Sequence, residues 1–112
     1  MECVFCAIGS GAVPATKRYE DPECVAFDDL HPKAPTHVLV IPRRHIPSVR
    51  ELGAGDAELV GRLVLIAREI AERVGIAEGG YKLVVNCGRD GGQVIPHLHV
   101  HLLGGKMVQG IV

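Results

Sequence analysis

The stretch HLHVHLL, residues 97–103, alternates histidine with aliphatic residues and ends at the pair Gly104-Gly105. Successive side chains of a β-strand point to opposite faces. The pattern therefore predicts a strand over 97–103 whose three histidines share one face, spaced ~6.6 Å apart at ~3.3 Å per residue. The opposite face then carries Leu98, Val100 and Leu102. We expect a half-buried strand with a polar working face.

Further strands are predicted on both sides of this pattern in the sequence. The segment 19–29 reads as two short strands around an Asp21-Pro22 turn. Apolar, β-branched strands are expected over 36–42 and 80–88, with loops between them.

One long helix is predicted between these strand groups. Apolar residues recur with helical spacing from 59 to 74, Asp56 precedes them as a cap, and Gly75 follows as a stop signal. A short helix is expected over 3–8, halted by the next glycines. This order predicts an α+β fold, an antiparallel sheet with helices on one side.

Length and composition restrict the class of protein. A chain of 112 residues, 47% hydrophobic and with a net charge of −1, is expected to form one domain over 1–112. The near-zero charge disfavours binding to duplex nucleic acid. No segment reaches the ~20 apolar residues of a membrane span, and the N-terminal segment lacks a signal-peptide pattern. We expect a cytoplasmic location, with reduced cysteines.

The histidine face allows three interpretations. It could be a hydrogen-bonded face without chemistry, a zinc-binding face, or a nucleophilic site, because a neutral imidazole attacks phosphorus without first losing a proton. The glycine-rich loop GRDGGQ, residues 88–93, lies just upstream and could bind a phosphate through its backbone amides. This loop favours the third interpretation.

Three blocks of the sequence resemble one known family. HLHVHLL fits the His-x-His-x-His-apolar-apolar signature of the histidine triad (HIT) superfamily. The blocks CVFCAI (3–8), AFDDLHPKAPTHVLVIPRRHI (26–46) and GGQVIPHLHVHLLGGKM (91–107) are similar to its Hint branch, the histidine triad nucleotide-binding proteins. The resemblance implies about five antiparallel strands, one long helix, a short N-terminal helix, and a dimer that joins two sheets into one.

The resemblance also implies a reaction. The middle histidine, His99, would attack the α-phosphorus of a purine nucleoside 5′-phosphoramidate and form a nucleotidyl-histidine that water then hydrolyses. His101 would hydrogen-bond the phosphoryl oxygens. His37 would help to hold the catalytic ring through the first triad position, His97. These four histidines are the predicted catalytic set.

A purine nucleotide of the AMP or GMP type is the implied ligand. Asp29 matches the acidic residue that accepts hydrogen bonds from the ribose hydroxyls, and its two carboxylate oxygens suit two adjacent hydroxyls. Apolar residues would enclose the base, and polar residues would surround the phosphate. The predicted nucleotide-binding residues are Phe5, Ile8, Phe27, Asp28, Asp29, Leu30, Asn86, Gly92, Gln93, Val94, His99 and His101.

A structural zinc ion is implied as well, with no metal needed for the chemical step. The CxxC pair alone could also be two buried thiols, and a redox pair is disfavoured because no thioredoxin-like βαβ pattern surrounds it. Similar bacterial proteins with this opening bind zinc through positions that are Cys3, Cys6, His45 and His97 in this chain, a closed Cys₂His₂ set.

Two departures from the family pattern affect specificity. Val94 occupies a position that often carries a hydroxyl, and the chain ends without the aromatic-bearing tail of the animal Hint proteins. The leaving group is therefore not predicted. A dinucleoside polyphosphate hydrolase and a zinc-containing nucleotide-binding protein with little turnover are the alternative functions.

A homodimer is predicted from the long helix as well as from the resemblance. Its charged residues occupy an arc of about 140° at 100° per residue, so about 220° is apolar or small. This is wider than the ~100° needed to cover one sheet. We expect a second subunit to bury the excess, with Leu63 and Ile66 as test positions.

Overall fold

The computed structural model of the protein describes residues 3–110 and contains one five-stranded antiparallel sheet. The strands lie in the order β1-β2-β3-β5-β4, so the histidine-bearing strand is next to the edge. Each neighbouring pair is antiparallel. The predicted α+β architecture is confirmed. The strands are β1 (Lys17–Glu20), β2 (Cys24–Asp28), β3 (Thr36–Pro42), β4 (Tyr81–Val84) and β5 (Val100–Gly104).

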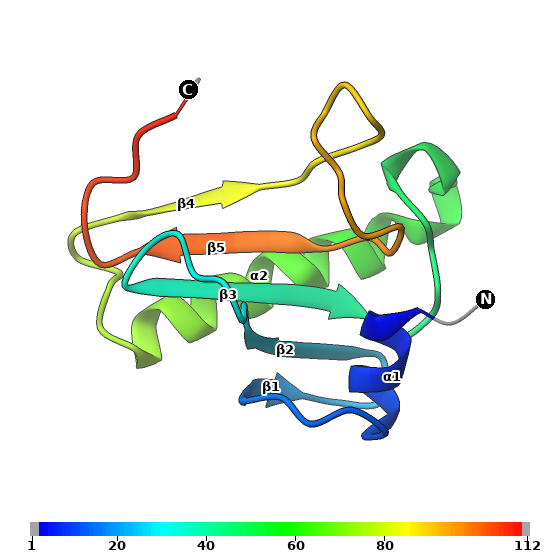
Figure 1. Ribbon diagram of the computed structural model, residues 1–112, viewed down its shortest axis with the longest axis horizontal. Helices are drawn as coiled ribbons and strands as arrows, with labels where there is room; N and C mark the ends of the chain where they lie inside the picture. The colour runs from blue at the N-terminus through cyan, green and yellow to red at the C-terminus, as the bar shows by residue number, and fades with distance from the viewer. Residues whose placement is uncertain (1–2, 111–112) are drawn as a thin grey trace.

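Two α-helices cover opposite faces of the sheet (Figure 1). The long helix α2 (Ala57–Arg73) crosses one face and buries Leu63, Ile66 and Ile70 in the main core. The short helix α1 (Val4–Ser10) packs on the other face. The expectation of helices on one side was therefore wrong, because Phe5 and Ile8 of α1 bury their side chains in a second, smaller core. Two 3₁₀ turns, Val49–Glu51 and Ala54–Asp56, lead into α2.

The small core places α1 beside the end of the sheet where the histidines lie. Phe5 and Ile8 pack against Phe27, Leu39 and Ile41, which alternate along β2 and β3 with residues that face α2. The helix begins at the Cys3 cap, whose thiol accepts from the Cys6 amide, and ends at Gly11 in the left-handed conformation, φ 85°. Its last residue is Ser10, two residues further along the chain than the predicted end at Ile8.

The histidine strand begins later than predicted. Its ladder starts at Val100, and the preceding Leu98 donates its amide to the Ile46 carbonyl at 2.7 Å, outside the sheet. The alternation nevertheless extends through 97–103, since Leu98, Val100 and Leu102 all lie in the main core. The predicted strand over 80–88 is likewise paired only from Tyr81 to Val84.

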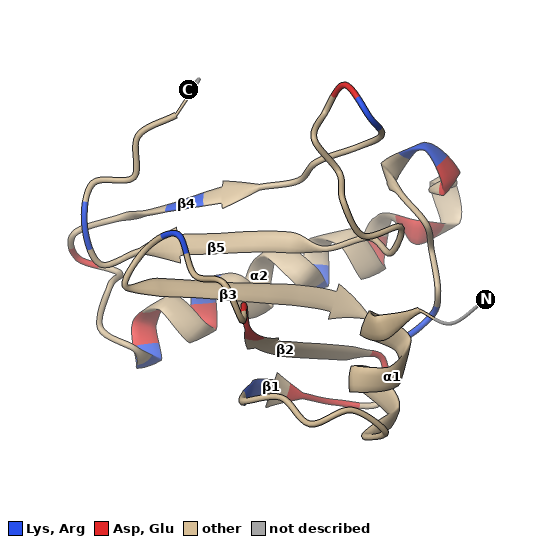
Figure 2. Cartoon of the chain, viewed as in Figure 1, with Lys and Arg blue, Asp and Glu red and all other residues tan. Residues whose placement is uncertain are grey.

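The expectation that Leu63 and Ile66 of α2 contact a second subunit is wrong. Leu63 and Ile66 are 0% and 5% exposed because they face the sheet, so neither is available to a second subunit. The exposed large apolar residues of the helix are Val64 and Leu65. Charged residues lie mainly on α2, on β1 and in loops, and the central strands β3 and β5 carry no charged residue (Figure 2). Within residues 3–110 we find no helix with the length and apolar character of a membrane span.

Candidate active site

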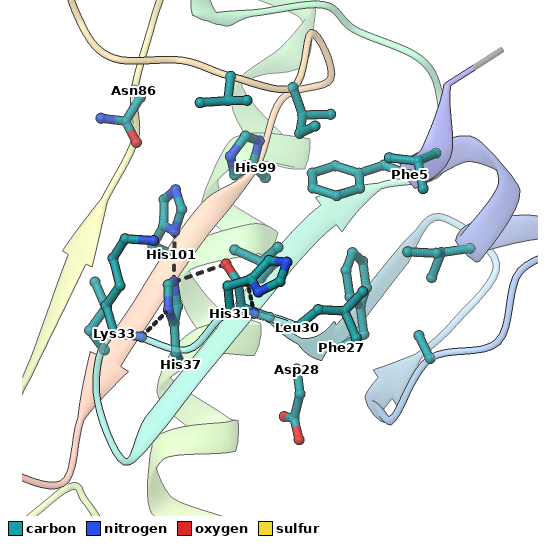
Figure 3. A pocket seen from close by; sticks show the side chains of 18 of the residues that line it. Phe5, Phe27, Asp28, Leu30, His31, Lys33, His37, Asn86, His99 and His101 are labelled. Carbon is teal, nitrogen blue, oxygen red and sulfur yellow. Dashed lines mark hydrogen bonds and ion pairs between the residues drawn. The ribbon is translucent and has the colours of Figure 1, made fainter.

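A cavity of about 580 Å³ lies on the α1 face of the sheet. This volume falls within the range of small-molecule sites. Its apolar end is formed by α1 and β2, with Phe5 and Phe27 edge to face at 5.4 Å. His99 and His101 of the histidine motif lie between this end and the β4 side (Figure 3). The cavity therefore offers an apolar end that could enclose the ring of a ligand, next to two imidazoles.

The structure brings nearly all of the predicted nucleotide-binding residues to this cavity. Gln93 is the exception, because its side chain joins the loop to the protein: the amide nitrogen donates to the Pro47 and Ile95 carbonyls at 2.7 and 2.9 Å. Those that line the cavity are Phe5, Ile8, Phe27, Asp28, Asp29, Leu30, Asn86, Gly92, Val94, His99 and His101.

The two acidic residues at the end of β2 differ in environment. Asp28 borders the cavity, but its carboxylate accepts two hydrogen bonds from the Arg18 guanidinium at 2.8 and 2.7 Å and points away from the other lining residues (Figure 3). Asp29 accepts from the His31 amide through one oxygen, and its other oxygen lies 3.4 Å from His37 Nε2. Asp29 is therefore the carboxylate that faces the histidines.

The hydrogen bonds of His99 assign its tautomer. Nδ1 lies 2.7 Å from the His97 carbonyl oxygen, which only accepts, so Nδ1 carries the proton and donates. Nε2 then carries the lone pair. The ring is held by Phe5, which contacts it edge on at a centroid distance of 5.2 Å. His99 thus presents a fixed, unprotonated nitrogen on a cavity wall.

His101 presents the opposite kind of nitrogen. The Lys33 amide donates to His37 Nδ1 at 3.1 Å, so the proton of the neutral His37 ring is on Nε2. That N–H donates to His101 Nδ1 at 2.9 Å, which leaves the His101 proton on Nε2. The contact of His37 is with the third triad histidine and not with His97. His101 is therefore a hydrogen-bond donor beside the lone pair of His99.

The His37 and His101 rings are neutral at pH 7 because the pKa of each is lowered. Burial is the main cause that lowers the pKa of His37, with nearby Lys33 and His99 adding to it and Asp29 opposing it. Burial, followed by the charges of His99 and His37, lowers the pKa of His101 to about 4. A neutral His101 donor is thus maintained beside His99 without a change of protonation at His37 or His101.

The glycine-rich loop is shaped by its own side chains. Asn86 donates to the Gly91 carbonyl at 2.7 Å, and Gln93 accepts from the Gly88 amide at 2.9 Å. A Cβ at Gly91 would lie 2.4 Å from the Cys87 carbonyl oxygen, so only glycine fits there. The loop is a closed turn that brings Gly92 and Val94 to the cavity rim.

A second cluster is built around His97, two residues before His99. His97 donates from Nε2 to the Pro42 carbonyl at 2.8 Å, so its Nδ1 lone pair faces Cys3 at 3.3 Å, Cys6 at 3.6 Å and His45 at 3.2 Å. Four ligands around tetrahedral zinc lie ~3.3 Å apart for two nitrogens and ~3.6 Å apart for nitrogen and sulfur. The four residues therefore fit a structural zinc ion and could hold one.

Some cavity residues have no sequence signal of their own. Val13, Pro14 and Ala15 line the cavity from the segment between α1 and β1, which lies alongside the end of β2 where the Asp28 amide donates to the Thr16 carbonyl at 3.0 Å. Lys33 and His31 come from the β2–β3 loop. Their loop positions follow no periodicity, so only the three-dimensional structure assigns them. For Lys33 the sequence offered one clue, its place in a proline-rich loop before a buried strand.

Comparison with known proteins identifies the family. The HIT domain family model matches residues 10–108. A protein named purine nucleoside phosphoramidase from Escherichia coli K12 is 44% identical over 105 residues, which is 94% of this chain and 88% of that protein.

Solved structures agree with this match. A histidine triad protein from Clostridium difficile has a TM-score of 0.96 at 39% identity, over 100% of this chain and 97% of the other. A zinc-bound histidine triad family protein from Mycobacterium smegmatis has a TM-score of 0.82 at 30% identity, over 95% of this chain and 76% of the other. On these matches and on the paired imidazoles of its cavity, the chain belongs to the HIT domain family.

Proposed function

We propose that this protein hydrolyses the phosphorus–nitrogen bond of purine nucleoside 5′-phosphoramidates. The observation that carries the proposal is the lone pair of His99 Nε2, held on the wall of a cavity with an apolar ring site at one end. The similarity to a phosphoramidase of Escherichia coli supports the same reaction.

The reaction then has two steps. His99 Nε2 attacks the α-phosphorus and forms a nitrogen–phosphorus bond as the bond to the leaving amine breaks and that amine takes up a proton from solvent water. The Nε2–H of His101 donates to a phosphoryl oxygen whose charge grows. Water next displaces His99 from phosphorus and releases the nucleoside monophosphate. A covalent intermediate replaces one difficult displacement by two easier ones.

Nucleotide binding is divided between the two ends of the site. Phe5, Ile8 and Phe27 would enclose the purine, while the Asp29 carboxylate accepts from the ribose hydroxyls. Leu30 and Val94 are more than four-fifths exposed at the rim, so an occupying nucleotide would cover apolar surface there.

One assay tests this function. The protein is incubated with adenosine 5′-phosphoramidate and, separately, with diadenosine polyphosphate, and AMP release is followed. Cleavage of the first substrate supports the proposal, and faster cleavage of the second would replace it by a polyphosphate hydrolase. Binding of AMP without cleavage of either substrate would leave a nucleotide-binding protein.

A structural zinc ion is part of the proposal. Cys3, Cys6, His45 and His97 would hold it and so attach the start of α1 to the segment before β5. The ion would supply no step of the reaction, since a neutral imidazole is already nucleophilic.

We also propose that the protein is a homodimer. β4 is an edge strand with open backbone groups, and its neighbourhood exposes Leu83 and Val85. On α2, Val60 and Val64 are one turn apart and not fully buried. Light scattering on a size-exclusion peak should give twice 12.0 kDa. Val64→Glu should weaken the dimer, whereas Leu65→Glu, on the charged side of the helix, should not.

A further inference from the structure

The charge of the cavity walls is uneven. Among residues 3–110, Lys33 is the only lysine or arginine that lines the cavity. Its side chain extends beside His101, on the side away from Phe5 and Phe27 (Figure 3). The charge of Lys33 also reaches both neighbouring rings, because it lowers the pKa of His37 and of His101. One end of the cavity is therefore apolar and the other carries a cation.

The strand register explains what lies at the Lys33 end. On β5, His101 is opposite Leu39 of β3 on one side and Val84 of β4 on the other. Directly opposite residues share a face, so Val84 lies beside His101 on the side away from β3. Leu103, two residues further along β5, is on the same face, and both side chains line the cavity. The cavity thus continues past His101 over an apolar floor.

Lys33 has no carboxylate partner in the protein. Among residues 3–110 its ammonium takes part in no ion pair, whereas Arg18 near the same loop is paired with Asp28. Lys82 on β4 shares the face of Leu103, but it is not a lining residue and its ammonium lies close to Gly110. Among residues 3–110, Lys33 is thus the cation that both lines the cavity and has no carboxylate partner.

We infer that the end of the cavity formed by Lys33, Val84 and Leu103 takes the leaving amine and selects amines that carry a negatively charged group, of which a carboxylate is the simplest. This inference rests on the proposed phosphoramidase function. A base at the aromatic end and a phosphoryl group between His99 and His101 leave this third region for the leaving group. The apolar floor suits the carbon atoms of the amine, and the ammonium of Lys33 suits its carboxylate.

A matched pair of substrates tests the inference. Adenosine 5′-phosphoramidates of glycine and of glycine methyl ester differ in one negative charge on the leaving group. The quantity measured is the ratio of kcat/KM for glycine to that for its ester. An exposed ion pair is worth up to about 1 kcal/mol, so Lys33→Gln should lower this ratio about fivefold. Lys82→Gln removes a charge from the same face outside the cavity and should keep the wild-type ratio.

Ionic strength gives a second measurement. Raising the salt concentration to about 0.5 M should bring the wild-type ratio towards that of Lys33→Gln, because salt screens an exposed pair. An unchanged ratio in Lys33→Gln would overturn the inference. If that unchanged ratio comes from an equal loss of kcat/KM on both substrates, Lys33 is assigned to the phosphoryl group instead. If AMP is released from neither substrate nor from adenosine 5′-phosphoramidate, the proposed function itself fails.

Discussion

Two histidine clusters on the same face of the sheet differ in what they can bind. The first contains Cys3, Cys6, His45 and His97, and the second contains Asp29, His37 and His101. In both sets the possible ligand atoms lie within 4.8 Å of one another. Distance alone would therefore suggest a metal ion in each.

The two clusters differ in the hydrogen bond made by the ring nitrogen that points away from the cluster, Nε2 in His97 and Nδ1 in His37. His97 donates from Nε2 to a carbonyl, so its lone pair faces the thiols and can bind a metal ion. His37 accepts from a backbone amide at Nδ1, so a proton occupies the nitrogen that faces Asp29 and His101. A neutral ring cannot bind a metal ion through a protonated nitrogen. The first cluster is thus suited to zinc and the second to orienting His101.

The largest effect is expected at His99, which lies between the clusters. His99→Ala removes the only lone pair proposed to attack phosphorus, so kcat should fall about a thousandfold or more. AMP binding, measured by calorimetry, should change little, and so should the metal content. Residual turnover within about tenfold of wild type would exclude His99 as the nucleophile.

The second cluster is tested at His37. His37→Ala removes the donor that fixes the His101 tautomer, and we expect kcat to fall about 100-fold with a smaller change in KM. His37→Gln carries an amide N–H that can replace this donor, so part of the activity should return. Metal content should equal that of wild type in both variants. Loss of the metal ion in His37→Ala would contradict the division into two clusters.

The sequence predicted the face of the histidines better than the extent of their strand. The period of two put His97, His99 and His101 on one side, and the apolar partners are buried as expected. The ladder nevertheless starts at Val100, because Leu98 pairs with the Ile46 carbonyl in a loop. Side-chain alternation is a local property of the sequence, whereas the end of a β-ladder depends on which other segments of the protein offer hydrogen-bond partners.

The tautomers and the cavity charge could not be predicted in the same way. Each tautomer depends on one distant group, Pro42 for His97 and the Lys33 amide for His37, and no spacing rule relates them. Gln93 is a residue for which the sequence predicted a ligand contact that the structure does not show. The family resemblance implied a contact of Gln93 with the phosphate or sugar, yet its side-chain amide donates to the Pro47 carbonyl and holds the loop there.

The metal cluster is expected to have a smaller effect on turnover than on stability. Cys6→Ser should abolish the bound zinc found by elemental analysis and lower Tm by about 10 °C, since a tightly bound ligand stabilises by about 2–3 kcal/mol. Phe5, between the two cysteines, contacts His99, so a modest loss of activity should follow. Cys87→Ser removes a thiol outside the cluster and should keep the zinc. A metal-free wild-type protein, purified without chelator, would exclude the site.

The smallest effect is a pH dependence of stability that arises from the second cluster. In the native protein the pKa of His101 is about 4, mainly through burial, while an unfolded histidine has a pKa near 6.5. Between these values the unfolded chain binds a proton that the native chain does not, so stability falls as the pH falls. His101→Asn lacks this group, and its Tm should decrease less on acidification, by up to about 5 °C per pH unit. Both proteins contain the same Cys₂His₂ cluster, so any loss of its metal ion contributes equally and cancels in the difference. Parallel Tm curves from pH 6.5 to 4.5 would mean that His101 is not held neutral by the fold.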